Sequence, residues 1–131
     1  MLFERELALR AHPSELPSAR RFFDAAAAEF GLDELGRYQV TMAANEAVSN
    51  AIRHGAPFDG GCVYLGAAAE DGKLVCSVHD GGSFELLGDA DPDPNGEHGR
   101  GLPLMNLLMD EVALDTSPDG TVVRLSKRRR A

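Results

Sequence analysis

The spacing of apolar residues changes along the chain, and the changes predict an order of strands and helices. Apolar residues alternate with polar ones from Phe3 to Leu9, which predicts a strand. After a break at His12-Pro13-Ser14, apolar residues recur every three or four positions up to Phe30, which predicts a helix. Ser14 is the expected N-cap of this helix, and Gly31 is expected to end it.

A second helical pattern follows directly. It begins after Asp33, the expected N-cap, and extends to about His54, where Gly55 is expected to end the helix. Its apolar side is predicted to carry Leu35, Tyr38, Met42, Ala43, Ala47, Val48 and Ala51.

The middle of the chain predicts a β-hairpin. Two alternating segments, Cys62 to Ala69 and Lys73 to Asp80, flank Asp71-Gly72, a dipeptide that favours a type I′ turn. With those two residues as the loop, Val63 faces Asp80. One face of the hairpin then carries apolar side chains and, at its end, the carboxylate of Asp80.

The last third of the chain begins with a segment of different character. Residues 85 to 98 are rich in Asp, Pro and Gly, carry five acids and no Lys or Arg, and are expected to form a mobile loop. Gly99-Arg100-Gly101 then opens a predicted helix from Leu102 to Asp110. Val112 to Asp115 and Thr121 to Ser126 are predicted to form a final hairpin.

This order of elements predicts an α+β fold, a two-layer sandwich with one mixed sheet and helices on one face. The chain has 131 residues, 44% of them apolar and 26% charged, which is typical of one globular domain spanning 1–131. The 13 basic and 21 acidic residues give a net charge of −8, which argues against a nucleic-acid partner. The basic run Lys127 to Arg130 is expected to be a solvated tail.

The sequence also indicates a cytoplasmic protein without membrane contact. No apolar run approaches the ~18 residues that a membrane-spanning helix needs, and the N-terminus does not resemble a signal peptide. The hairpin register separates Cys62 and Cys76 onto opposite faces, so no disulfide is expected between them.

The segment from Asn45 to Gly55 carries the most informative polar residues. Glu46 and Asn50 are four positions apart, so they share one face of the helix among Ala, Val and Ile residues. An amide oxygen beside nucleotide phosphates suits Mg²⁺, and the carboxylate then remains available as a base. The alternative is a buried polar pair satisfied within the protein. His54 is interpreted as a residue that caps the helix end, and Arg53 as solvated.

Three further signals are individually weak. Asp80, followed by Gly81-Gly82, either recognises an amino group such as that of adenine or simply initiates a turn. The segment from His98 to Leu102 places two glycines and Arg100 before a helix, which suits an anion but also occurs by chance. Thr121 follows Gly120 and is either a site residue or an ordinary strand residue.

Together and in this order, the four signals resemble the Bergerat-fold superfamily of ATPases and histidine kinases, and within it the anti-sigma factor serine kinases. The resemblance extends from about Phe3 to Leu125. It rests on the motif Glu46-x-x-x-Asn50-Ala51-x-x-His54-Gly55 and on the glycine segment Gly99-Arg100-Gly101-Leu102-Pro103-Leu104-Met105, followed by Met109-Asp110-Glu111-Val112.

The resemblance implies a role for each matching residue. It implies that Asn50 binds Mg²⁺ and that Glu46 is the general base toward the attacking hydroxyl. It implies that Asp80 reads the adenine amino group, with Gly82 shaping the pocket, and that residues 85 to 98 form an ATP lid. The other residues that it assigns to ATP binding are Gly99, Arg100, Gly101, Leu102 and Thr121.

The implied function is an ATP- and Mg²⁺-dependent serine kinase that also holds a sigma factor inactive. Its substrate would be a serine of a STAS-type anti-anti-sigma protein, and the resemblance suggests a homodimer. Phe84 replaces the last glycine of the superfamily's Asp-x-Gly-x-Gly motif, which favours an alternative, a nucleotide-gated binding module without kinase activity. A detached histidine-kinase domain would need a phosphoacceptor helix before Phe3, and none is expected there. Neither the sigma factor, nor its antagonist, nor the upstream signal is identified by the sequence.

Overall fold

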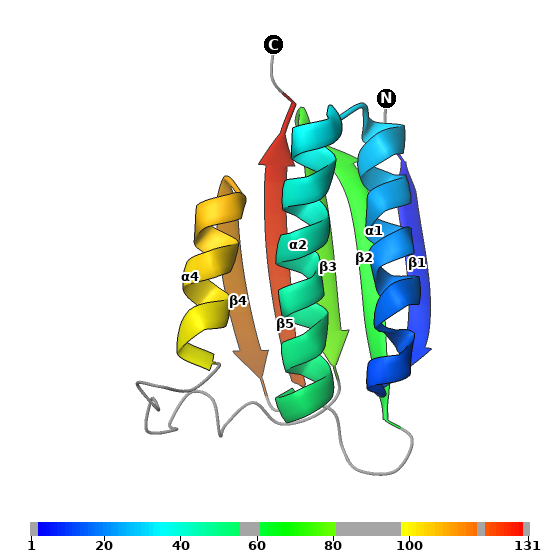
Figure 1. The fold of residues 1–131 in the computed structure, drawn as a ribbon, viewed down its shortest axis with the longest axis vertical. Coiled ribbons are helices and arrows are strands. Elements are labelled where there is room, and N and C mark those ends of the chain that lie inside the picture. The colour runs from blue at the N-terminus through cyan, green and yellow to red at the C-terminus, as the bar shows by residue number, and fades with distance from the viewer. Residues whose placement is uncertain (1–2, 56–60, 81–97, 118–119, 130–131) are drawn as a thin grey trace.

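The protein is a two-layer sandwich in which helices cover one face of a five-stranded sheet (Figure 1). The computed structural model describes residues 3–55, 61–80, 98–117 and 120–129, and only the backbone of 54–55, 98–102 and 117. The α+β sandwich expected from the sequence is confirmed. No helix in these ranges is long and apolar enough to cross a membrane.

The elements follow the predicted order, with boundaries that differ by a few residues. The helical layer consists of α1 (Leu16–Phe30), α2 (Glu34–Asn50) and α4 (His98–Leu108). Two short helical turns accompany them, a 3₁₀ turn η1 (Pro13–Glu15) and a π turn η2 (Ala51–Gly55). The strands are β1 (Glu4–Arg10), β2 (Cys62–Glu70), β3 (Lys73–Asp80), β4 (Glu111–Ser117) and β5 (Gly120–Arg128).

The sheet is antiparallel at every pairing in the described residues, so the prediction of a mixed sheet was wrong. The strand order is β1-β2-β3-β5-β4. Since β5 pairs antiparallel with both β3 and β4, these two strands run in the same direction. They would form a parallel pair if they were adjacent, but β5 inserts between them and satisfies the hydrogen-bonding edge of each.

The central hairpin has the predicted register. Val63 pairs with Asp80 and Glu70 with Lys73, so the loop consists of Asp71 and Gly72. Both loop residues have positive φ angles, 49° and 77°, as a type I′ turn requires. The register places Asp80 on the face of the sheet that the helices cover, where it is 1% exposed.

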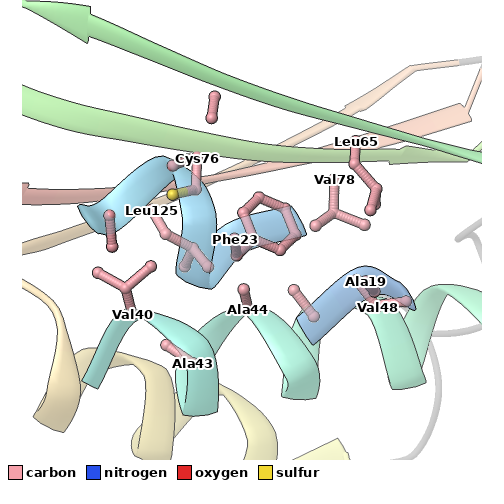
Figure 2. Close-up of a cluster of buried hydrophobic side chains, with 14 of the residues drawn as sticks. Ala19, Phe23, Val40, Ala43, Ala44, Val48, Leu65, Cys76, Val78 and Leu125 are labelled. Carbon is pink, nitrogen blue, oxygen red and sulfur yellow. The ribbon is translucent and has the colours of Figure 1, made fainter. Parts of the chain in front are cut away.

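The core lies between this face and the helices (Figure 2). Phe23 of α1 is fully buried between α2 and the sheet, close to Val78 and Leu125. The buried side of α2 consists of small residues, which lets the helix approach the sheet closely. Leu35 and Tyr38, predicted to lie on this side, are 50% and 60% exposed, because the buried stripe includes neither residue. The stripe is made of Gly36, Val40, Ala43, Ala44, Ala47 and Val48.

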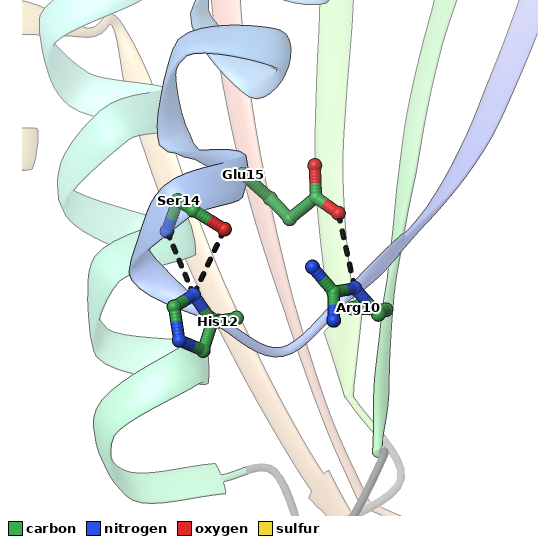
Figure 3. A network of polar contacts seen from close by, with 4 residues as sticks. All are labelled: Arg10, His12, Ser14 and Glu15. Atoms are coloured by element: carbon green, nitrogen blue, oxygen red, sulfur yellow. Dashed lines mark hydrogen bonds and ion pairs between the residues drawn. The ribbon is translucent and has the colours of Figure 1, made fainter.

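The start of α1 also differs from the prediction. Ser14 does not cap this helix, because the 3₁₀ turn precedes it and moves the helix start to Leu16. Instead His12 caps the 3₁₀ turn, with its Nδ1 accepting a hydrogen bond from the Ser14 backbone N–H at 3.1 Å (Figure 3). Asp33, in contrast, caps α2 as predicted, because its Oδ1 accepts from the Gly36 N–H at 2.8 Å.

No disulfide joins Cys62 and Cys76, which are in the pairing strands but face opposite sides of the sheet. Cys76 is completely buried in the core, and this burial raises the pKa of its thiol to about 12. Because the thiolate is the reactive form, Cys76 is a structural residue and not a nucleophile.

Candidate functional site

Four segments that carry predicted site residues meet at one end of the molecule. The last turn of α2, the end of β3, the start of β5 and the first turn of α4 all lie at the lower end in Figure 1. The antiparallel pairing of β3 with β5 brings two of these segments together, because β5 starts beside the residue where β3 ends. Residues separated by up to 75 positions in sequence, from Glu46 to Thr121, are therefore gathered at one edge of the helix–sheet interface.

Asp80 and Thr121 form the sheet side of the site. They are direct partners across β3 and β5, so their side chains project next to each other toward the helical layer. Asp80 is 1% exposed and Thr121 is fully buried. The Thr121 hydroxyl Oγ1 has no hydrogen-bond partner among the described residues. A buried hydroxyl without a partner costs about 1–3 kcal/mol, so this position is unfavourable for the fold alone.

Asn50 and Glu46 form the helix side of the site. Asn50 is the last residue of α2 and is half-buried, but its amide oxygen Oδ1 is completely buried. This oxygen has no hydrogen-bond partner among the described residues, so the alternative of a polar pair satisfied within the protein is not supported for Asn50. Glu46 lies one helical turn earlier and is half-buried.

The helix does not continue in α form past Asn50. The chain winds into the π turn η2 over Ala51–Gly55, where an uninterrupted α-helix to His54 was predicted. π turns are rare and concentrate at functional sites, because the extra residue changes where the following side chains and carbonyls point. The turn begins with ordinary helix residues, Ala51, Ile52 and Arg53. The local sequence therefore does not predict a change from an α-helix to a π turn.

Two predictions for neighbouring residues have different outcomes. Arg53 is exposed, as predicted, and its guanidinium donates to the Ser49 hydroxyl at 3.1 Å. The proposed capping role of His54 concerns a side chain outside the described residues.

The glycine segment lies inside α4 and not before it. The helix begins at His98, four residues earlier than predicted, so Gly99, Arg100, Gly101 and Leu102 occupy its first turns. The structure describes only the backbone of these residues. The N-terminal end of α4 lies at the same end of the molecule as Asn50, which agrees with a shared site (Figure 1). Gly82, Phe84 and residues 85–97 of the predicted lid lie outside the described residues.

The described residues fit a nucleotide with its metal ion. Mg²⁺ takes oxygen ligands and keeps few protein ones, and the buried Oδ1 of Asn50 is an oxygen of this kind that no other described residue contacts by a hydrogen bond. The adjacent polar side chains of Asp80 and Thr121, in otherwise apolar surroundings, are suited to the polar edge of a base. Two buried oxygens at this end of the core have no hydrogen-bond partner among the described residues, and a ligand bound there would supply one.

Comparison with known families gives the same assignment. The histidine kinase-like ATPase domain matches residues 9–127, which is most of the chain. The chain belongs to this family. The Bergerat-type resemblance inferred from the sequence motifs is therefore confirmed.

Relatives of this ATPase-family chain include anti-sigma F factors. That of Bacillus subtilis (strain 168) is 33% identical over 111 residues, covering 73% of this chain and 70% of the relative. That of Clostridium acetobutylicum is 34% identical over 98 residues, covering 68% of each chain.

Solved structures show the same family fold. The crystal structure of the RsbU and RsbW domains of Rv1364c from Mycobacterium tuberculosis matches 98% of this chain with a TM-score of 0.74 and 25% identity. The present chain spans only 34% of that structure. A histidine kinase domain from Erythrobacter litoralis matches 86% of this chain with a TM-score of 0.58 at 19% identity, which shows the fold alone.

Proposed function

We propose that this chain is an ATP- and Mg²⁺-dependent protein serine kinase that also acts as an anti-sigma factor in the cytoplasm. Its substrate would be a serine of a STAS-type anti-anti-sigma protein. The observation that carries the proposal is the buried amide oxygen of Asn50, which has no partner in the part of the chain that the structure describes and lies one helical turn after Glu46. In this proposal the amide oxygen is a ligand for a hard cation and the carboxylate is a base, at the end of the molecule where Asp80 and Thr121 lie.

Phosphoryl transfer requires positioning, charge neutralisation and a group that accepts the proton of the attacking hydroxyl. In this proposal Asn50 holds Mg²⁺, which neutralises phosphate charge when it is bound. Glu46 accepts the proton of the substrate serine, since it lies one turn before Asn50 on the same helix face and is only half-buried.

The remaining predicted residues hold the nucleotide. The Asp80 carboxylate accepts a hydrogen bond from the adenine amino group, beside the Thr121 hydroxyl, and Gly82 shapes the same pocket. Gly99 and Gly101 let the backbone at the start of α4 approach the phosphates, and the helix N-terminus favours their negative charge. In the proposal, Arg100 and Leu102 also contribute to ATP binding at the start of α4.

The partners are proposed from the relatives. Curated relatives with about a third of their residues identical are named anti-sigma F factors, which supports a sigma factor as one partner. The RsbW domain in the matched M. tuberculosis structure supports the same regulatory class. We further propose that the chain acts as a homodimer and without direct contact to nucleic acid, in agreement with its net charge of −8.

A second candidate is a nucleotide-gated binding module without kinase activity. The observation that favours it is Phe84 in place of a glycine of the superfamily motif. The two candidates differ in one measurable event, the transfer of labelled phosphate from ATP to a STAS protein. A wild-type chain that binds ATP and a sigma factor but phosphorylates no cognate STAS protein would establish the second candidate.

Glu46→Gln separates the chemistry from nucleotide binding. Phosphorylation of the STAS protein should fall by about 10²-fold or more, the usual contribution of a general base, while ATP affinity stays close to wild type. Asn50→Ala should instead lose Mg²⁺-dependent ATP binding and activity together. The assay is transfer of γ-labelled phosphate, with calorimetry for ATP affinity.

Glu34→Gln is the matched control, because Glu34 is an exposed carboxylate in the first turn of the same helix, distant from the site. It should leave both quantities unchanged. Wild-type rates in Glu46→Gln would contradict the assignment of the base.

A further inference from the structure

The last strand of the sheet, β5, joins the candidate site to the opposite end of the molecule (Figure 1). Thr121, near the start of β5, pairs with Asp80, and Lys127 follows six residues later near the end of the strand. Alternate residues of a strand share a face, so Lys127 projects from the same helix-covered side of the sheet as Thr121. At about 3.4 Å per residue, the two positions lie about 20 Å apart.

The side chain of Lys127 is attached to the C-terminal end of α4. Its ammonium Nζ donates a hydrogen bond to the backbone carbonyl of Leu108 at 2.7 Å, and Leu108 is the last residue of the helix. The carbonyls in the last turn of a helix lack partners within the helix and carry partial negative charge, so a lysine is favoured there. The prediction of a solvated basic tail was therefore wrong for Lys127, which is half-buried.

Asp110, two residues after the end of α4, adds to the same attachment. Its backbone N–H donates to the Ser126 carbonyl at 3.0 Å, and its carboxylate Oδ2 accepts from the Arg128 backbone N–H at 2.7 Å. Together with the contact between Lys127 and Leu108, these hydrogen bonds form the α4 clamp. The clamp joins the C-terminal end of α4 to consecutive residues at the end of β5.

The N-terminal half of α4 has little intrinsic stability as a helix. Gly99 and Gly101 lower the helix propensity of its first turns, and Pro103 has no N–H to donate to the Gly99 carbonyl four residues earlier. Met105 and Met109 towards the other end of the segment are buried, at 1% and 5% exposure. The C-terminal half, with its buried methionines and the α4 clamp, therefore sets the position of the helix.

We propose that Lys127 is a positioning residue, which places the glycine segment at the start of α4 against Asn50 by holding the other end of the helix. This rests on the proposed function, in which the backbone at Gly99 and Gly101 approaches the nucleotide phosphates. Because Lys127 lies about 20 Å along β5 from Thr121, it acts on the nucleotide through α4 and not by direct contact.

The length of α4 shows why a contact at its far end matters for the site. The helix has 11 residues and is about 16 Å long. A tilt of about 4° around the clamped end displaces the first turn by about 1 Å. A displacement of about this size, far from the chemistry, can lower activity by about 10²-fold.

Hydrogen exchange of the nucleotide-free full chain tests the attachment. Lys127→Met removes the donor and keeps most of the side-chain length. The amides from Leu104 to Met109 should then exchange about tenfold faster than in the wild type, while the amides of β2 and β3 should be unaffected. A general loss of stability would accelerate exchange in all of these segments.

Two further variants serve as rescue and control. Lys127→Arg keeps a donor within reach of the Leu108 carbonyl and should restore wild-type exchange in α4. Arg128→Met is the matched control, because Arg128 is the adjacent base, is exposed and projects from the other face of the sheet. Its backbone N–H is retained, so its exchange should match that of the wild type.

Calorimetry with ATP and Mg²⁺ tests the positioning role, on variants that circular dichroism shows to be folded. The dissociation constant of ATP should rise about tenfold in Lys127→Met and return close to the wild-type value in Lys127→Arg. A contact that only stabilises the fold would leave the affinity of the folded protein unchanged. Asp110→Ala removes another side-chain contact of the α4 clamp and should act in the same direction, so the test does not depend on the folding of Lys127→Met.

The possible failures are distinguishable. Wild-type exchange of α4 in folded Lys127→Met would overturn the attachment and, with it, the positioning role. Faster exchange with unchanged ATP affinity would overturn the positioning role and leave Lys127 as a structural contact. A wild-type chain that binds no ATP would overturn the nucleotide site of the proposed function, while the exchange measurement would still decide whether Lys127 holds α4.

Discussion

The two ends of the interface between α2 and the sheet are built differently. From the beginning of α2 to its middle, the buried side chains are apolar and include Val40, Phe23, Leu125 and Cys76 (Figure 2). At the end where α2 finishes, the same interface buries Asp80, Thr121 and the amide oxygen of Asn50. Asp80 and Thr121 are as completely buried as Val40 and Phe23, so for these residues the difference lies in chemistry and not in burial.

The difference assigns separate tasks to the two ends. The apolar end supplies burial energy, which for a side chain such as Phe23 amounts to about 1.5–3 kcal/mol. The polar end contains two oxygens without partners among the described residues, and a buried oxygen without a partner costs stability. Among the described residues, this cost arises next to the end of α2 and the π turn η2, at the end of the molecule where we propose that a nucleotide binds.

The largest expected effect is at the apolar end. Phe23→Ala should lower the free energy of unfolding by about 3–5 kcal/mol, because the ring is fully buried and its removal leaves a cavity. Urea unfolding measures the change. Phe22→Ala is the control. The ring of Phe22 packs edge-on against that of Phe23, with 5.0 Å between the ring centroids, but it is only partly buried, so the loss of stability should be clearly smaller. Equal losses would show that Phe23 is not the centre of the core.

A substitution at the polar end should raise the free energy of unfolding instead of lowering it. Thr121→Val removes the unpartnered hydroxyl and keeps the shape, so the free energy of unfolding without nucleotide should rise by about 1 kcal/mol. ATP binding should weaken by up to about tenfold. Urea unfolding and calorimetry measure the two quantities. Thr116→Val is the control, because Thr116 pairs with Thr121 across the strands but is exposed. It should change neither the free energy of unfolding nor ATP binding. A destabilised Thr121→Val would show that the hydroxyl is satisfied in the fold.

The smallest effect concerns the outer surface of the helical layer, which belongs to neither end. Arg37 of α2 makes two hydrogen bonds of 3.0 Å to Asp24 of α1, and they lower the pKa of the Asp24 carboxyl. A carboxyl with a lowered pKa stabilises the fold above its unfolded pKa, and this contribution is lost as the pH falls through the folded value. Both side chains are more than a third exposed, so the contribution is small.

Asp24→Asn should therefore be slightly less stable than wild type at pH 7, and the difference should disappear in acid below the usual Asp pKa of about 3.9. Urea unfolding across this pH range provides the measurement. Arg37→Gln should produce the same pH dependence, and the two changes together should not add. A difference that persists unchanged at low pH would rule out the ion pair as its source.

The sequence was sufficient for features that neighbouring residues decide. The hairpin between β2 and β3 has the predicted register because Asp71-Gly72 accepts two positive φ angles and the flanking residues alternate. The same alternation placed Asp80 on the buried face. Asp33 caps α2 as predicted, since the interaction lies within four residues.

Features that depend on distant segments were decided only by the tertiary structure. The insertion of β5 between β3 and β4 made the sheet antiparallel and set Thr121 beside Asp80. The rotation of α2 against the sheet left Leu35 and Tyr38 exposed, because close packing there selected a stripe of small residues. The sequence determined which polar residues the chain carries near Asn50. Whether their atoms find partners depends on what the other layer of the sandwich presents, and a buried oxygen is satisfied or left unpaired only once both layers are in place.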